Sequence, residues 1–121
     1  MLVPIIPPRT HGWLDDAVVI TYLMGGRLLG LGHTALGIAL AGAFVHFLLT
    51  RLTDFPQGFA RIFPFRVHGI VELGEGIGVL AATWTLLPDE APLGHRVFLT
   101  LMGISQLAAF AFSDYRWPPE K

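Results

Sequence analysis

A seven-residue pattern occurs twice in the chain, and each copy opens a long apolar run. Residues 9–15 read Arg-Thr-His-Gly-Trp-Leu-Asp, and residues 66–72 read Arg-Val-His-Gly-Ile-Val-Glu. Both copies follow Arg-x-His-Gly-x-x-acid, and no basic residue follows the second copy before Arg96. This repetition predicts a duplicated membrane hairpin, with ionisable groups placed where each copy enters the bilayer.

The composition favours a membrane protein over a water-exposed domain. Hydrophobic residues make up 53% of the chain, charged residues 14%, and the mean hydropathy is +0.59. A typical soluble domain carries about 25% charged residues. The length of 121 residues suits one compact unit, and a net charge of −1 gives no sign of a nucleic-acid partner. The absence of cysteine excludes disulfides and thiolate chemistry.

Four apolar segments are expected to form helices, over residues 10–31, 33–52, 65–87 and 93–113. Each has about 20 residues, the length that crosses roughly 30 Å of hydrocarbon. The alternative is a soluble bundle of buried helices. It is less favoured because the segments have no polar face that water could solvate. We therefore predict an all-α integral membrane four-helix bundle, a single transmembrane domain over residues 1–121.

Two duplicated transmembrane hairpins are predicted, because short turns join the first segment to the second and the third to the fourth. The first hairpin covers about residues 10–52 and the second about residues 65–113. The second and fourth segments both end in an acid followed by an aromatic residue, Asp54-Phe55 and Asp114-Tyr115. The connection over residues 53–64 mixes apolar and polar side chains and is expected to be a short amphipathic segment in the membrane interface.

Small residues and aromatic residues fit the same arrangement. Glycines crowd the first and third segments and are expected to let helices pack closely in lipid. These glycines are Gly25, Gly26, Gly30, Gly69, Gly74, Gly76 and Gly78. The tryptophans and tyrosines, including Tyr22 and Tyr115, are expected mostly near the two interfaces.

Ionisable and amide side chains concentrate in one half of the predicted bundle. His68, Glu72 and Glu75 have the spacing i, i+4, i+7, which places them on one helix face. His11 and Asp15 repeat the first two positions, and His46 and Gln106 occupy matching places in the second and fourth segments. The candidate polar cluster is therefore His11, Asp15, His46, His68, Glu72, Glu75 and Gln106.

A structural role is the preferred hypothesis for this cluster, with no cofactor. In this role His11 and His68 would each form a hydrogen bond with the carboxylate one turn later in the same helix. The residues expected at lipid headgroups or the interface are Arg9, Arg61, Arg66 and Trp117.

Two alternatives remain open. Imidazole with carboxylate suits zinc, iron or manganese, and His46 with His68 would also suit a haem. Proton or ion transfer along Glu75, Glu72 and His68 is the other alternative.

No catalytic constellation is evident, because Ser105 and Ser113 have no histidine at a persuasive helical spacing. We expect a small non-enzymatic membrane protein. An accessory or structural subunit of a larger membrane complex, such as a respiratory or photosynthetic one, fits best, and self-association is the other expected partnership.

The chain resembles small bacterial four-helix membrane proteins related to the SPW-repeat family. Arg9, His11, Gly12 and Asp15 match the first-helix pattern of that group, although Asp16 stands where an aromatic residue is usual. Later positions that match are Leu52, Thr53, Asp54, Gly58, Arg61, Pro64 and His68. The Ser-Pro-Trp signature is replaced by Thr-Trp-Thr-Leu-Leu-Pro at residues 83–88. The resemblance implies the fold and a membrane location.

Basic residues predict the orientation in the cell inner membrane. One side carries Arg9, Arg51, Arg61, Arg66, Arg116 and Lys121, and the other carries only Arg27 and Arg96. The positive-inside rule then places both termini in the cytoplasm.

Because the chain has no native cysteine, Val3→Cys and Pro119→Cys should each escape a membrane-impermeant thiol reagent in intact cells and react after lysis. Labelling of both from outside would reverse the predicted topology.

Overall fold

Four helices account for most of the computed structural model, which describes residues 2–119. They are α1 (Pro8–Leu28), α2 (His33–Leu52), α3 (Phe65–Leu86) and α4 (Leu93–Phe112). The predicted segments match these bounds to within three residues, so the all-helical, four-helix prediction is confirmed at the level of the fold.

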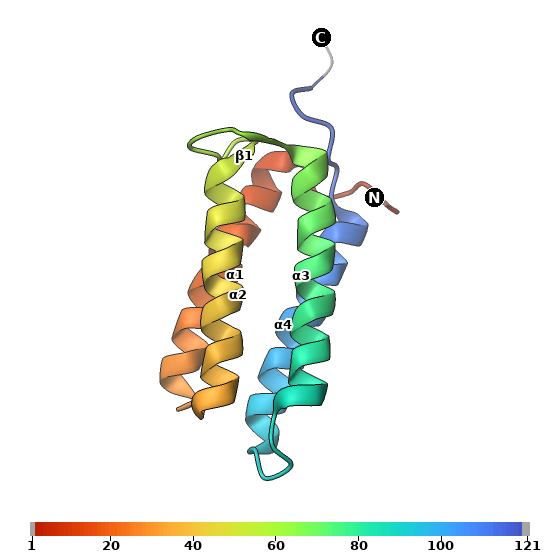
Figure 1. Ribbon diagram of the computed structural model, residues 1–121. Coiled ribbons are helices and arrows are strands. Elements are labelled where there is room, and N and C mark those ends of the chain that lie inside the picture. Colours follow the sequence, from red (N-terminus) through yellow and green to blue (C-terminus); the bar gives the residue numbers. More distant parts are fainter. Residues whose placement is uncertain (1, 120–121) are drawn as a thin grey trace.

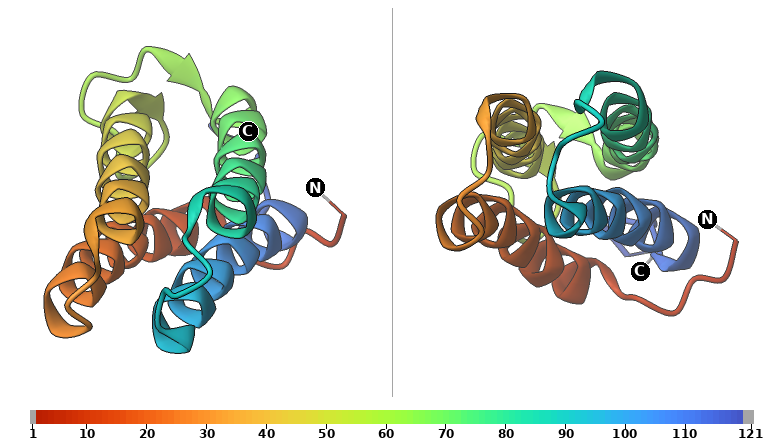
Figure 2. Two further views of the ribbon diagram at one scale, coloured as in Figure 1. Left: turned by 60° about the horizontal axis from the view of Figure 1, so that its bottom comes forward. Right: turned by 90° about the horizontal axis from the view of Figure 1, so that it is seen from below.

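The helices form two antiparallel hairpins that lie side by side (Figure 1). α1 packs mainly on α2, and α3 packs mainly on α4. α1 and α3 run in the same direction, so the first turns of both helices lie at the same end of the bundle as the segment that joins α2 to α3. The two short hairpin loops lie at the opposite end (Figure 2).

The connection between the hairpins contains two short strands. β1 (Thr53–Asp54) pairs in parallel with β2 (Phe63–Pro64), and the chain between them folds back over the end of α2. Phe55 is fully buried, whereas Phe59 is 88% exposed. Phe55 therefore packs inside the protein, with its ring 4.8 Å from that of Phe65 between centroids, and the interfacial location of the segment stays a prediction.

The segment before α1 runs beside the end of α4. The backbone amides of Ile5 and Ile6 donate to Phe112 O, and the amide of Asp114 donates to Ile6 O at 2.8 Å. These bonds fix the chain that follows α4, so that Ser113 and Tyr115 lie over the first turns of α1 and α3. Both residues are at least 95% buried.

Exposed apolar side chains and buried polar side chains are both numerous in the bundle. Large apolar side chains are exposed on all four helices, for example Ile20, Phe44, Ile77 and Leu101. The buried polar residues are His11, Asp15, His46, Thr50, Thr53, His68, Glu72, Thr83, Gln106 and Ser113. Among the described residues, α2 and α4 are long and apolar enough to cross a membrane. The ionisable residues of α1 and α3 lower the hydropathy of those helices.

Small residues allow close packing at some positions and not at others. A Cβ at Gly76 would lie 3.1 Å from Gly103 O, which confirms close approach of α3 and α4 there. Gly42 makes room for the ring of Tyr22. Tyr22 is fully buried in the core and is not exposed at the surface of the bundle. Gly74 and Gly78 have no atom within 4 Å of an added Cβ, so the packing role predicted for them is wrong.

The environment of Gly69 predicts a stability test. An added Cβ there would lie 2.8 Å from the buried ring of Tyr115, so Gly69→Ala should lower the midpoint of thermal unfolding in detergent. The control is Gly74→Ala on the same helix, which meets no atom and should stabilise the helix by up to about 1 kcal/mol. Equal effects of the two changes would contradict the packing described.

Candidate functional site

The two repeated motifs meet inside the bundle. His11 and Asp15 lie one turn apart at the start of α1, and His68 and Glu72 occupy the same places on α3. All four residues are at least 99% buried. One ligand atom from each lies within 4.8 Å of the ligand atoms of the other three, an arrangement suited to a metal ion.

The contacts between α1 and α3 are at least as short as the contacts within each helix. His11 Nε2 lies 3.2 Å from Asp15 Oδ1 and also 3.2 Å from Glu72 Oε2. His68 Nε2 lies 3.1 Å from Asp15 Oδ2 but 3.9 Å from Glu72 Oε2. The predicted bond to the acid one turn later is therefore present in the first motif, whereas in the second motif the carboxylate of the other helix is closer.

The imidazoles of His11 and His68 face one another with their Nε2 atoms. His11 Nε2 and His68 Nε2 are 3.2 Å apart. Thr53 Oγ1 donates its one proton to Leu49 O at 2.6 Å, so it accepts a hydrogen bond from Nδ1–H of His68 at 2.9 Å. His68 therefore carries a proton on Nδ1. Its Nε2 faces His11 and Asp15, where it either shares the proton that lies between the two rings or offers a lone pair to a metal ion.

The first motif has an equivalent hydroxyl partner. Ser113 Oγ lies 2.5 Å from Nδ1 of His11. Sequence reasoning missed the roles of Ser113 and Thr53, although a signal was present. Each hydroxyl residue directly precedes one of the repeated acid-aromatic pairs, at Asp54 and Asp114.

His46 extends the cluster toward α3. Its Nε2 lies 3.0 Å from Asp15 Oδ1, and its Nδ1 lies 2.8 Å from Glu75 Oε2. Both nitrogens thus face carboxylate oxygens, which an imidazolium satisfies by donating at both positions. The Thr50 hydroxyl lies 3.3 Å from the second oxygen of Asp15. Asp15 consequently contacts histidines from α1, α2 and α3.

Two tyrosines complete the network. Tyr115 OH donates to Glu72 Oε2 at 2.9 Å. Burial, with the nearby Glu72 carboxylate, raises the pKa of Tyr115 far above its usual value, so the hydroxyl remains a donor. Tyr22 OH donates to Gln106 Oε1 at 2.6 Å and joins the two hairpins. Tyr115 is the aromatic residue of the second acid-aromatic pair, whereas no sequence pattern links Tyr22 to the cluster.

The glycine of each motif makes room for a residue that closes the site. A Cβ at Gly12 would lie 2.0 Å from Gln57 Cγ, and one at Gly69 would lie 2.8 Å from the Tyr115 ring. Gln57 is held in turn by Asp16, which also forms an ion pair with Arg51. A side chain in place of either glycine would therefore collide with Gln57 or with Tyr115.

The structure brings all seven predicted cluster residues together, at the end of the bundle where the sequence placed them. His46, Glu75 and Gln106 form its inner part. The four residues predicted at headgroups or the interface lie on the outside of the same end. Arg9 and Arg66 are exposed, Arg61 lies 3.5 Å from Asp54, and Trp117 is half-buried against the aromatic cluster.

Comparisons with family models, with curated proteins and with solved structures give no match to this chain. The relation to the SPW-repeat family therefore stays a prediction. The chemistry of the cluster is the basis for assigning a function.

The crosswise contacts can be tested by double-mutant cycles. Removing one member of a buried polar pair costs about 1–3 kcal/mol. Without bound metal, the coupling free energy of unfolding between His68→Ala and Asp15→Ala should exceed that between His68→Ala and Glu72→Ala, because the first pair is 3.1 Å apart and the second 3.9 Å. Thermal unfolding of the single and double variants after chelation measures both. Stronger coupling within α3 would contradict the geometry.

Proposed function

We propose that the protein is a membrane-embedded four-helix bundle that binds one divalent transition-metal ion, for which Zn²⁺ is the best match. The ligands are His11 Nε2, His68 Nε2 and one carboxylate oxygen each from Asp15 and Glu72. The single observation that carries the proposal is the convergence of these four buried ligand atoms within 4.8 Å of one another.

The distances between ligand atoms support a tetrahedral ion. Zinc binds imidazole nitrogen and carboxylate oxygen at about 2.0–2.1 Å, so the edges of a tetrahedron around it measure about 3.3 Å. His11 Nε2 lies 3.2 Å from His68 Nε2, from Asp15 Oδ1 and from Glu72 Oε2. His68 Nε2 lies 3.1 Å from the other oxygen of Asp15 and 3.9 Å from Glu72 Oε2, so the two carboxylates would adjust slightly to place one oxygen each on the ion. Hydroxyl partners on the outer Nδ1 atoms orient both rings, as outer hydrogen-bond partners of metal-binding histidines do.

The charges of the cluster support a cation. His46, as an imidazolium between Glu75 and Asp15, balances one of three buried carboxylates. His11 and His68 have room for only one proton between Nε2 atoms 3.2 Å apart, so the pair carries at most one positive charge and at least one carboxylate charge remains unbalanced. A divalent ion bound to two neutral imidazoles balances both remaining carboxylates. Unbalanced buried charge is costly in a low-dielectric environment.

Four protein ligands fill a tetrahedral site, and filled zinc sites are structural. The ion would join α1 to α3, and therefore the first hairpin to the second. This role agrees with the expectation of a non-enzymatic protein. A subunit role in a larger complex and a part in proton or ion transfer both stay predictions. A haem between His46 and His68 is disfavoured, because Asp15 contacts both imidazoles and occupies the space between them.

The membrane location rests on the exposed surface. Large apolar side chains are exposed along all four helices, and the ionisable residues of the cluster are buried between the helices. Two helices meet the length and hydropathy of a membrane span. Placing all four helices in a bilayer, with the cluster toward the cytoplasm, accounts for both features.

Metal analysis tests this proposal. Protein purified in mild detergent without chelator should hold about one zinc per chain by mass spectrometry. His11→Ala, His68→Ala and Glu72→Gln should each lose it, whereas His33→Ala, an exposed histidine at the opposite end, should keep it. Zinc binding should weaken as the pH falls, because protons compete for the imidazoles.

Zinc should also raise the midpoint of thermal unfolding of the chelator-treated protein, because the ion binds only the folded state. Double changes at His68 and Glu72 should recover no metal. A wild-type protein that neither carries nor takes up zinc, iron or manganese, and whose His68 variants lose only stability, would establish a purely hydrogen-bonded cluster.

A further inference from the structure

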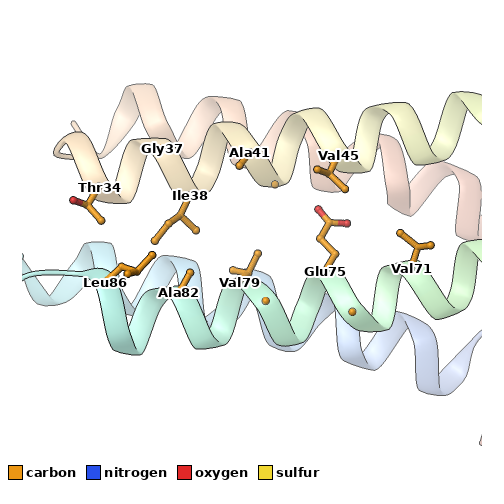
Figure 3. Close-up of a pocket in the computed structure, with 13 residues that line it drawn as sticks. Thr34, Gly37, Ile38, Ala41, Val45, Val71, Glu75, Val79, Ala82 and Leu86 are labelled. Carbon is orange, nitrogen blue, oxygen red and sulfur yellow. The ribbon is translucent and has the colours of Figure 1, made fainter.

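An apolar groove of about 740 Å³ runs between α2 and α3 (Figure 3). Its lining side chains are apolar or absent, except for Thr34 at one end and Glu75 near the other. Between Thr34 and Val45 the groove follows about 16 Å of α2, at 1.5 Å per residue. Its volume lies in the range of pockets that hold small molecules.

Glycines on both walls keep the groove open. Gly37 on α2 and Gly74 and Gly78 on α3 line it, and an added Cβ at any of the three would meet no atom within 4 Å. These residues differ from Gly76 of the same helix, which packs directly on α4. The space between α2 and α3 is thus not filled by the side chains of this chain.

Glu75 supplies a second and independent observation. Its side chain reaches from α3 toward α2, into the groove (Figure 3), and is 6% exposed. Oε2 accepts a hydrogen bond from His46 at 2.8 Å, but Oε1 is buried without a hydrogen-bond partner. A buried polar atom without a hydrogen-bond partner is energetically costly. The missing partner is therefore expected in the groove.

We propose that the groove between α2 and α3 binds an elongated apolar molecule whose terminal hydroxyl group donates a hydrogen bond to Oε1 of Glu75. A hydroxyl suits this atom better than a cation does, because His46 already serves as the charged partner of the carboxylate. The apolar tail lies along the glycines toward Thr34. This binding site goes beyond the metal centre and does not depend on it, since Glu75 is not among the four metal ligands.

Photocrosslinking with a defined probe tests the site. The full-length protein in lipid nanodiscs is irradiated with dodecanol that carries a diazirine in mid-chain, and modified residues are located by peptide mass spectrometry. Adducts should concentrate on residues 34–45 and 71–86, and excess dodecanol should displace them. The methyl ether of the same probe lacks the donor and should label about tenfold less, the effect expected for one hydrogen bond to a charged group.

Two variants separate the groove from general partitioning into lipid. Gly78→Leu should fill the groove and abolish the adducts while leaving the zinc content unchanged, and Glu75→Leu should remove the preference for the alcohol. Gly94→Leu, which adds the same side chain at an open position of α4 outside the groove, should label as wild type does.

Equal labelling by alcohol and ether, or stronger labelling by the corresponding dodecylamine probe, would overturn the proposal. Adducts that persist in Gly78→Leu would also overturn it. If the wild-type protein binds no zinc, the labelling results expected here do not change, so each proposal can fail without the other.

Discussion

The buried carboxylate of Asp15 is the constraint on which the rest of the structure depends. It is 99% buried and lies within 3.2 Å of imidazole nitrogens from α1, α2 and α3. An ionised group at such a depth is stable only when positive charge or hydrogen-bond donors surround it. Satisfying Asp15 therefore requires three helices to converge at one end of the bundle, and this convergence fixes how the two hairpins meet.

The residues around the cluster orient its side chains and do not add to its charge. Ser113 and Thr53 set the orientation of the two facing imidazoles, and Tyr115 fixes Glu72. Each of these three comes from the chain just beyond the end of α2 or α4, and the motif glycines leave room for the side chains that cover the site. A metal ion between the imidazoles would complete a set of groups that are already oriented, which lowers the entropic cost of binding.

The concentration of polar groups at one end of the bundle also accounts for the groove. Because the polar groups are concentrated at one end, the remaining length of α2 and α3 meets through small apolar residues and leaves a gap that begins at Glu75. His46 is the link between the two regions, since one of its nitrogens contacts Asp15 and the other contacts Glu75. The proposed metal site and the groove are thus adjacent but involve different side chains.

The sequence by itself determined the helices and the membership of the cluster. Apolar length gave the four segments, and the repeat placed His11 with Asp15 and His68 with Glu72 at one end, because helical periodicity is a local property. Only the tertiary structure decided which histidine meets which carboxylate. It also turned Phe55 and Tyr22 inward and left Gly74 and Gly78 facing an open groove. These outcomes depend on the distance and rotation between helices, which packing sets and local periodicity does not encode.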